Sequence, residues 1–133
     1  MIDYLQRGDE FPSWRELFDQ GALEQIEMNI NDLLVQEPTE GLYILSHRWE
    51  SKDHPFPVGS EKISKLLTLL DETPEIKHLW IDYACLPQGE RSGPEKEFFK
   101  TSLENANILY FTQYVILLID LQCKLFGCPP PNV

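Results

Sequence analysis

The chain has 133 residues, which is enough for one domain around a single hydrophobic core. Its formal net charge of −11 opposes binding to nucleic acids or to anionic membranes, and its longest apolar run is far too short to span a bilayer. Three cysteines and no signal-peptide pattern argue against a secreted disulfide framework, so we expect a cytoplasmic protein with reduced thiols.

Residues 1–37 are expected to form a helical N-terminal extension. Ser13 and Glu16 have the spacing of a capping box, in which each side chain accepts a hydrogen bond from the other residue's backbone, and Gly21 suits the end of that first helix. Apolar residues then recur at helical spacing: Leu23, Ile26, Ile30 and Leu33. This pattern predicts an amphipathic helix that packs on the core or, alternatively, binds a partner in self-association.

Residues 42–46 predict a first strand that is buried on both faces, because their apolar run is nearly unbroken. A long polar loop follows over residues 50–60, and Ser60 is placed to cap the next helix. That helix is expected to turn one apolar stripe inward: Ile63, Leu66, Leu67 and Leu70. Its charged residues are expected to face solvent: Glu61, Lys62, Lys65 and Asp71.

A second strand over residues 79–83 leads through a polar loop into a helix at 95–106. The apolar residues of that helix are expected to face inward: Phe98, Phe99 and Leu103. Two apolar segments, 107–111 and 115–119, then form either one long strand or two pieces separated by a kink. We favour the kink, because Gln113 inside a strand covered on both faces would need a buried partner.

The order strand, helix, strand, helix, strand with short links predicts parallel strands. We therefore expect an α/β domain over residues 38–120, with a flavodoxin-like three-layer sandwich around a mainly parallel sheet. Residues 121–133 are expected to form an irregular tail, because the prolines at 129–131 exclude a long helix there.

Polar residues follow both of the first two predicted strands, at the ends where those strands stop. Adjacent parallel strands would bring the two sets to one crevice at the carboxyl edge of the sheet. An arginine suits a phosphate, an indole ring suits stacking on a base, and a carboxylate accepts hydrogen bonds from a ribose. The sequence therefore predicts a nucleotide-type site formed by Ser46, His47, Arg48, Trp49, Asp82, Cys85 and Gln88.

Each of these residues also has a purely structural interpretation. Asp82 would then cap a turn or neutralise Arg48, while Trp49 and His47 would belong to the core. A nucleophilic pair of Cys85 and His47 is a further alternative, and it would make the chain a cysteine-dependent hydrolase. The histidines and cysteines have no metal-ligand spacing, and there is no glycine-rich phosphate loop. We therefore expect no metal and no required cofactor.

Two segments resemble motifs of the heterokaryon-incompatibility (HET) domain, a relative of Toll/interleukin-1 receptor (TIR) domains. Leu45-Ser-His-Arg-Trp49 resembles the family's LSY-x-W-like element, and Trp80-Ile-Asp-Tyr-Ala-Cys-Leu-Pro-Gln88 resembles its WID-x-L-C-I-N-Q element. The chain departs from the family where His47-Arg48 replaces an aromatic residue and where Leu86-Pro87 replaces Ile-Asn. The resemblance covers residues 42–119 and implies a flavodoxin-like fold.

The resemblance implies a module of defence or cell-death signalling that associates with itself or with other TIR/HET-like domains. It also implies an alternative, because many TIR domains cleave NAD at the nicotinamide–ribose bond with a glutamate on the helix after the third strand. NAD would then be a substrate or ligand and not a required cofactor. No glutamate follows Glu104 in this chain, so the catalytic residues stay unassigned.

Overall fold

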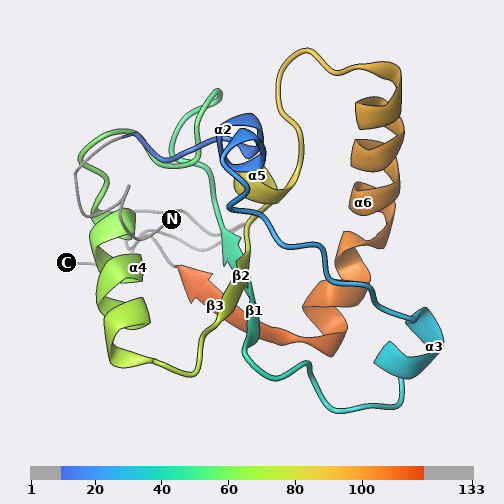
Figure 1. Cartoon of the computed structure of the whole chain (residues 1–133). Helices are drawn as coiled ribbons and strands as arrows, with labels where there is room; N and C mark the ends of the chain where they lie inside the picture. Colours follow the sequence, from blue (N-terminus) through green and yellow to red (C-terminus); the bar gives the residue numbers. More distant parts are fainter. Residues whose placement is uncertain (1–9, 119–133) are drawn as a thin grey trace, which may run out of the picture.

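The structure, a computed structural model, describes residues 10–118. Helices connect three parallel strands of an open sheet in a mixed α/β fold (Figure 1). The elements, in chain order, are α2 (Trp14–Asp19), α3 (Ile30–Leu33), β1 (Leu42–His47), α4 (Glu61–Glu72), β2 (His78–Trp80), α5 (Asp82–Cys85), α6 (Gly93–Thr112) and β3 (Tyr114–Leu118). None of the helices in this part of the chain has both the length and the apolar composition to cross a membrane. The tail predicted at 121–133 lies outside the described residues.

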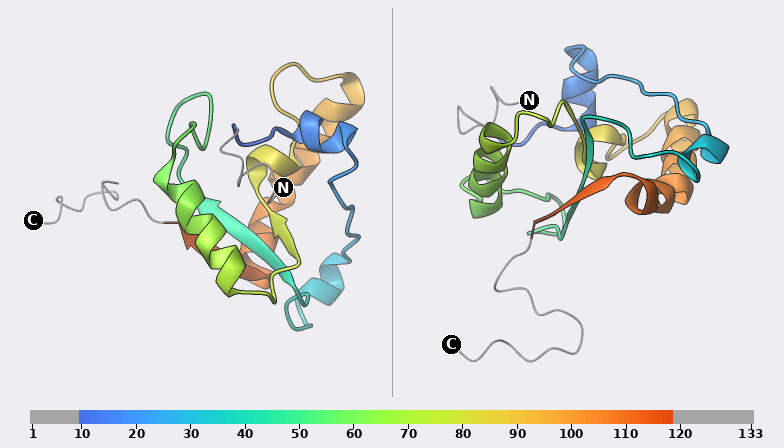
Figure 2. Two further views of the ribbon diagram at one scale, coloured as in Figure 1. Left: turned by 60° about the vertical axis from the view of Figure 1, so that its left-hand side comes forward. Right: turned by 90° about the horizontal axis from the view of Figure 1, so that it is seen from below.

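The central strand of the sheet is β1, and the strand order is β2-β1-β3. Leu42 pairs with His78 on one side, and His47 pairs with Leu118 on the other, both in parallel register. All three strands therefore end at the same edge of the sheet, as the sequence predicted. Figures 1 and 2 place α4 and α6 on opposite sides of this sheet.

The hydrophobic core joins segments that are far apart in the sequence. Its buried members are Phe11, Leu17, Leu45, Phe56, Leu66, Ile81 and Ala84. The predicted apolar stripe of α4 packs against them through Ile63, Leu67 and Leu70, which confirms that prediction. Because Phe11 and Leu17 precede the sheet in the chain, part of the N-terminal extension packs into the same core as the strands.

Lys62 is buried, although the sequence predicted that it faces solvent. Its side chain is 4% exposed, and its Nζ donates a hydrogen bond to the carbonyl oxygen of Arg48 at 2.8 Å. Lys62 lies one helical turn before Leu66, so it shares the buried side of α4. Ser60 occupies the N-cap position of α4, but its hydroxyl accepts no hydrogen bond from a helix N–H. It donates a hydrogen bond to the carboxylate of Glu50 instead. The start of α4 is therefore fastened to the end of β1.

The first predicted helix is confirmed, and the second is largely wrong. Ser13 and Glu16 form the capping box, and Gly21 follows α2 with a φ of 66°. Residues 22–29 contain no helix, and α3 is only one short turn. Leu23 packs against the core, but Ile26 and Ile30 are exposed, so the middle of the predicted apolar stripe covers no surface, and a short isolated helix is unstable in water.

Helix α6 continues through residues 107–111, which the sequence assigned to a strand. Phe98 and Leu103, predicted to face inward, are about half exposed. Phe99 is partly covered by Arg91, whose guanidinium lies 3.5 Å from the centre of the ring. Part of the apolar surface of α6 therefore stays open to solvent, and part is covered by the loop that precedes the helix.

The break before β3 lies at Gln113, the C-cap of α6. Its backbone N–H still donates to the carbonyl oxygen of Leu109, and its buried side-chain oxygen accepts from the backbone N–H of Thr39 at 2.8 Å. The preference for a kink is therefore correct at this residue. The segment before the kink is helix and not strand.

Candidate functional site

The two strand-end motifs meet at the carboxylate of Asp82. Strand β2 ends at Trp80, and Asp82 opens α5, so the prediction of a strand through residue 83 is wrong. Asp82 Oδ1 accepts from the backbone N–H of Tyr83 at 2.7 Å, and Oδ2 accepts from Trp49 Nε1 at 3.1 Å. His47 Nε2 lies 3.4 Å from Oδ1. The prediction that the ends of β1 and β2 lie within side-chain reach is confirmed.

The pKa of the Asp82 carboxyl lies below its ordinary value of 3.8. Burial raises this pKa, but the interactions with His47, the Tyr83 N–H and the Trp49 indole together lower it by more. The carboxyl is therefore ionised at neutral pH, and its side chain is still 38% exposed. It can accept hydrogen bonds from a ligand, but it holds no proton to donate as a general acid.

His47 is enclosed by the protein. Its side chain is 2% exposed, and its ring stacks on Phe56 with the ring centres 4.6 Å apart. Within residues 10–118 neither ring nitrogen has a hydrogen bond, since the 3.4 Å approach to Asp82 is too long for a good one. A buried polar group without a partner costs free energy, and such costs are more usual at functional positions than in an ordinary core.

A second histidine, His54, closes the same region from the loop after β1, and the sequence did not single it out. Its Nδ1 accepts from the backbone N–H of Phe56 at 3.0 Å, which places the ring proton on Nε2. Nε2 then donates to the carbonyl oxygen of Phe11 at 3.3 Å, and the ring packs on Tyr83 with centres 4.7 Å apart. The sequence signal for this role is the Pro55-Phe-Pro57 segment, because its prolines stiffen the loop.

The remaining predicted residues surround Asp82 in different ways. The side-chain amide of Gln88 donates to the carbonyl oxygens of Leu86 and Asp82, at 3.0 and 3.4 Å, and so fastens the turn after α5. Arg48 is exposed at the same edge of the sheet. Ser46 is half-buried in β1, and its hydroxyl has no hydrogen bond within the described chain. The structure thus brings His47, Gln88 and Trp49 to Asp82, but not Ser46.

Cys85 lies in α5, and its Sγ faces the carbonyl oxygen of Leu79 at 4.0 Å. Burial raises the pKa of this thiol to about 11, and the Asp82 carboxylate also raises it, while the contact with Ile81 lowers it. The thiolate is the nucleophilic form of cysteine. Cys85 is therefore a protonated thiol at neutral pH, which disfavours the pair with His47.

Alkylation of Cys85 by iodoacetamide is expected to be slow at pH 7.5 and to rise until about pH 11. Relative to a thiol of pKa 9.0, the thiolate fraction at pH 7.5 is about 100-fold lower. Mass spectrometry of a Cys123→Ser, Cys128→Ser variant measures the rate at this position alone. The same variant in urea is the control, and equal rates in both conditions would contradict the prediction.

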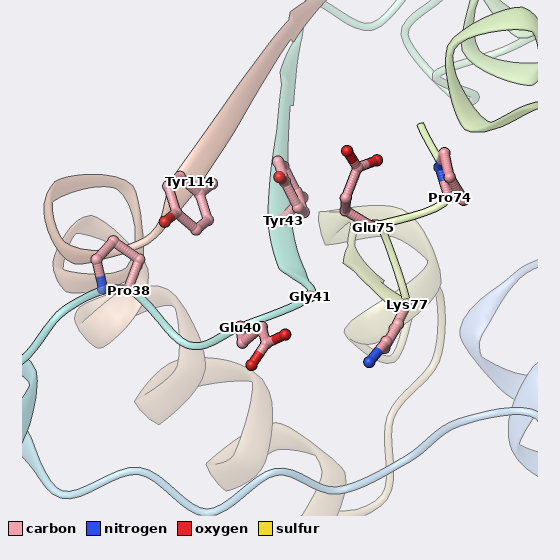
Figure 3. A pocket seen from close by; sticks show the side chains of 8 residues that line it. All are labelled: Pro38, Glu40, Gly41, Tyr43, Pro74, Glu75, Lys77 and Tyr114. Atoms are coloured by element: carbon pink, nitrogen blue, oxygen red, sulfur yellow. The ribbon is translucent and has the colours of Figure 1, made fainter. Parts of the chain in front are cut away.

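Aromatic rings contact one another at the carboxyl edge of the sheet, where the crevice was predicted: the indole of Trp49 meets the ring of Tyr83 edge-on at 5.7 Å. A hollow of about 510 Å³ lies instead at the opposite edge, where the strands begin (Figure 3). It is lined by Pro38, Glu40, Gly41, Tyr43, Pro74, Glu75, Lys77 and Tyr114. No group of three or more potential metal ligands occurs in the part of the chain that the structure describes.

Comparisons of the chain with protein-family models, curated proteins and solved structures found no match. The likeness to TIR and HET domains therefore depends on the two motifs themselves. In the structure these motifs share Asp82, since His47 and Trp49 of the first both contact this residue of the second.

Proposed function

We propose that this chain is a TIR/HET-like signalling or defence module of the cytoplasm that acts mainly by associating with itself or with other domains of its kind. The observation that carries the proposal is the apolar edge of the sheet. Tyr114, Val115 and Leu117 of β3 are 46%, 37% and 65% exposed, and Phe111 just before them is 88% exposed. Exposed apolar strand edges pair readily with other chains unless charge or proline blocks them.

A flavodoxin-like three-layer fold is part of the same proposal. The flavodoxin-like strand order is 2-1-3-4-5, and the order β2-β1-β3 found here is how such a sheet begins. In that order β3 is an internal strand, and its outer edge pairs with a neighbour. The exposed edge of β3 is therefore where this fold calls for a further strand, which a second copy of the domain would supply.

We further propose that the carboxyl edge keeps a nucleotide-type ligand site around Asp82. The ionised carboxylate is in part open to solvent, and the exposed Arg48 and the half-buried indole of Trp49 lie at the same edge. A cation, an aromatic ring and an acceptor are the groups that such a ligand needs. Since His47 is enclosed and the Gln88 amide bonds the backbone, these two residues shape the site from behind.

The association is tested by sedimentation velocity over a range of protein concentrations. The wild type is expected to self-associate, and Leu117→Lys to weaken association at least about tenfold, because a lysine on an edge strand blocks pairing. Val58→Lys is the matched control, since Val58 is also exposed, at 70%, and lies in the loop before α4. A wild type that stays monomeric, or two variants that weaken association equally, would overturn the proposal.

The same samples discriminate the NAD glycohydrolase alternative. They are incubated with NAD, dilute and at concentrations that favour assembly, and free nicotinamide is measured. If the chain acts by association alone, we expect no free nicotinamide. Release of nicotinamide would make the chain an enzyme, and a loss of that release in Asp82→Asn would assign the reaction to the carboxyl edge.

A further inference from the structure

The hollow at the amino edge of the sheet has the size of a small-molecule site, but no predicted functional residue lies in it. Its volume of about 510 Å³ falls within the usual range for ligand pockets. It is formed by the loop before β1, the loop before β2 and the first residues of β1 and β3. It is therefore separate from the Asp82 cluster, which lies where the strands end.

Two tyrosines form its aromatic surface. Tyr43 of β1 and Tyr114 of β3 are register partners, and their rings stack with centres 5.2 Å apart and planes 25° apart. Neither hydroxyl has a hydrogen bond within residues 10–118. The faces of aromatic rings carry partial negative charge, so a stacked pair at the wall of a hollow attracts cations.

The charged groups around the tyrosines reinforce this preference. Figure 3 shows the Glu75 side chain beside Tyr43 and the Glu40 side chain at the base of the same strand. Neither carboxylate has an ion pair or hydrogen bond within the described part of the chain. Lys77, the one basic residue of the lining, extends away from the two rings in Figure 3.

The position of Lys77 follows from the backbone beside it. Gly41 has a φ of +77°, and a β-carbon there would lie 3.2 Å from three carbons of the Lys77 side chain. Glycine thus leaves room for the apolar stem of the lysine to pack against the chain. Within the described residues the lysine amine forms no ion pair with Glu40 or Glu75.

We propose that this hollow binds an organic cation, an ammonium or guanidinium group on a short apolar stem. The ring faces of Tyr43 and Tyr114 would cover the stem and the cation, and Glu40 and Glu75 would supply the counter-charge. A net charge of −11 on the whole chain raises the local concentration of such ligands. The cation belongs either to a free diamine or polyamine or to an arginine side chain of a peptide.

Titration of the full, isotope-labelled chain with agmatine and, separately, with the acetylated and amidated peptide Gly-Arg-Gly tests the proposal by NMR. Saturable shifts of the Tyr43 and Tyr114 ring signals are expected. Tighter binding of agmatine identifies a free cation as the ligand, and tighter binding of the peptide identifies an arginine side chain. No saturable shift at either ring with both probes at millimolar concentration would overturn the proposal.

Variants separate this site from general attraction to an acidic protein. Tyr114→Ala is expected to weaken binding about two- to fivefold, and Tyr114→Phe to leave it unchanged, because the ring face is the binding element. Glu75→Gln is expected to weaken binding by a similar factor, whereas Glu97→Gln, the same charge change on an exposed face of α6, is not. Equal effects of the two glutamine variants on binding would show that only the total charge of the chain attracts the cation. That result would overturn the proposal of a specific site.

Discussion

Phe56→Ala is expected to lower the free energy of unfolding by about 3–5 kcal/mol. Phe56 is 1% exposed, and its ring joins the loop after β1 to the core. It packs edge-on against Phe11 with centres 5.1 Å apart and stacks on His47 at 4.6 Å. Alanine would remove both contacts and leave a cavity that the sheet cannot collapse to fill.

Urea unfolding followed by circular dichroism measures this effect. Phe111→Ala is the matched control, because it deletes the same ring from a side chain that is 88% exposed, and we expect it to change stability by less than about 0.5 kcal/mol. Similar losses for the two variants would mean that Phe56 is not a core residue, and the enclosure of His47 would then be wrong as well.

Asp82→Ala is expected to cost about 2 kcal/mol at pH 7. The carboxylate accepts from the Tyr83 N–H and from Trp49 Nε1, and alanine would leave both donors without this partner. The loss stays below the largest values known for buried groups, because the side chain is 38% exposed and solvent screens part of the interaction.

The Trp49 part of this loss can be isolated with Trp49→Phe, which keeps an aromatic ring and removes the indole N–H. A double-mutant cycle with Asp82→Ala is expected to give a coupling energy of about 0.5–1.5 kcal/mol. A coupling near zero would show that the 3.1 Å hydrogen bond contributes nothing to stability.

The pH dependence of Asp82→Ala has a definite sign. The folded-state pKa of Asp82 is lowered below 3.8, so its stabilising contribution is fully present above that value and is lost as the pH falls through the lower, folded-state pKa. The stability difference between wild type and Asp82→Ala is therefore expected to shrink below about pH 3.8. A difference that grows on acidification would contradict the assignment.

The parts of the fold that periodicity determines could be predicted from the sequence. The apolar runs predicted as strands at 42–46 and 115–119 and the apolar stripe of α4 indicated the correct types of element for β1, β3 and α4. The prediction of a helix at 23–33 was largely wrong, because an amphipathic helix is stabilised by the surface that it covers. Ile26 and Ile30 are exposed and cover no such surface. The strand predicted at 107–111 is instead part of α6, because a short run of apolar and aromatic residues does not by itself distinguish a strand from a helix.

The contacts of the candidate site that result from neighbouring parallel strands could be predicted from the sequence. The contacts that result from the path of the loops could not. Parallel, adjacent strands bring Trp49 to Asp82, and the alternation of strands and helices predicted that β1 and β2 are parallel. The enclosure of His47 depends on Phe56, whose backbone N–H is held by His54, and both residues come from a long loop whose path no pattern specifies. The tyrosine hollow likewise depends on the register of β1 and β3, whose paired residues are 71 positions apart in the sequence and cannot be aligned from composition.

The leading segment of the chain is held by contacts that join residues distant in sequence. The Phe11 carbonyl meets His54, Arg15 pairs with Glu95 at 2.9 Å, and Glu24 pairs with His78, across 43, 80 and 54 residues. Because closing such long loops costs entropy before the contacts can form, we expect this segment to dock late in folding. Because it carries Phe11 onto Phe56, the last segment to dock completes the wall behind His47. Its local detachment would open the Asp82 cluster to water while the strands stay paired.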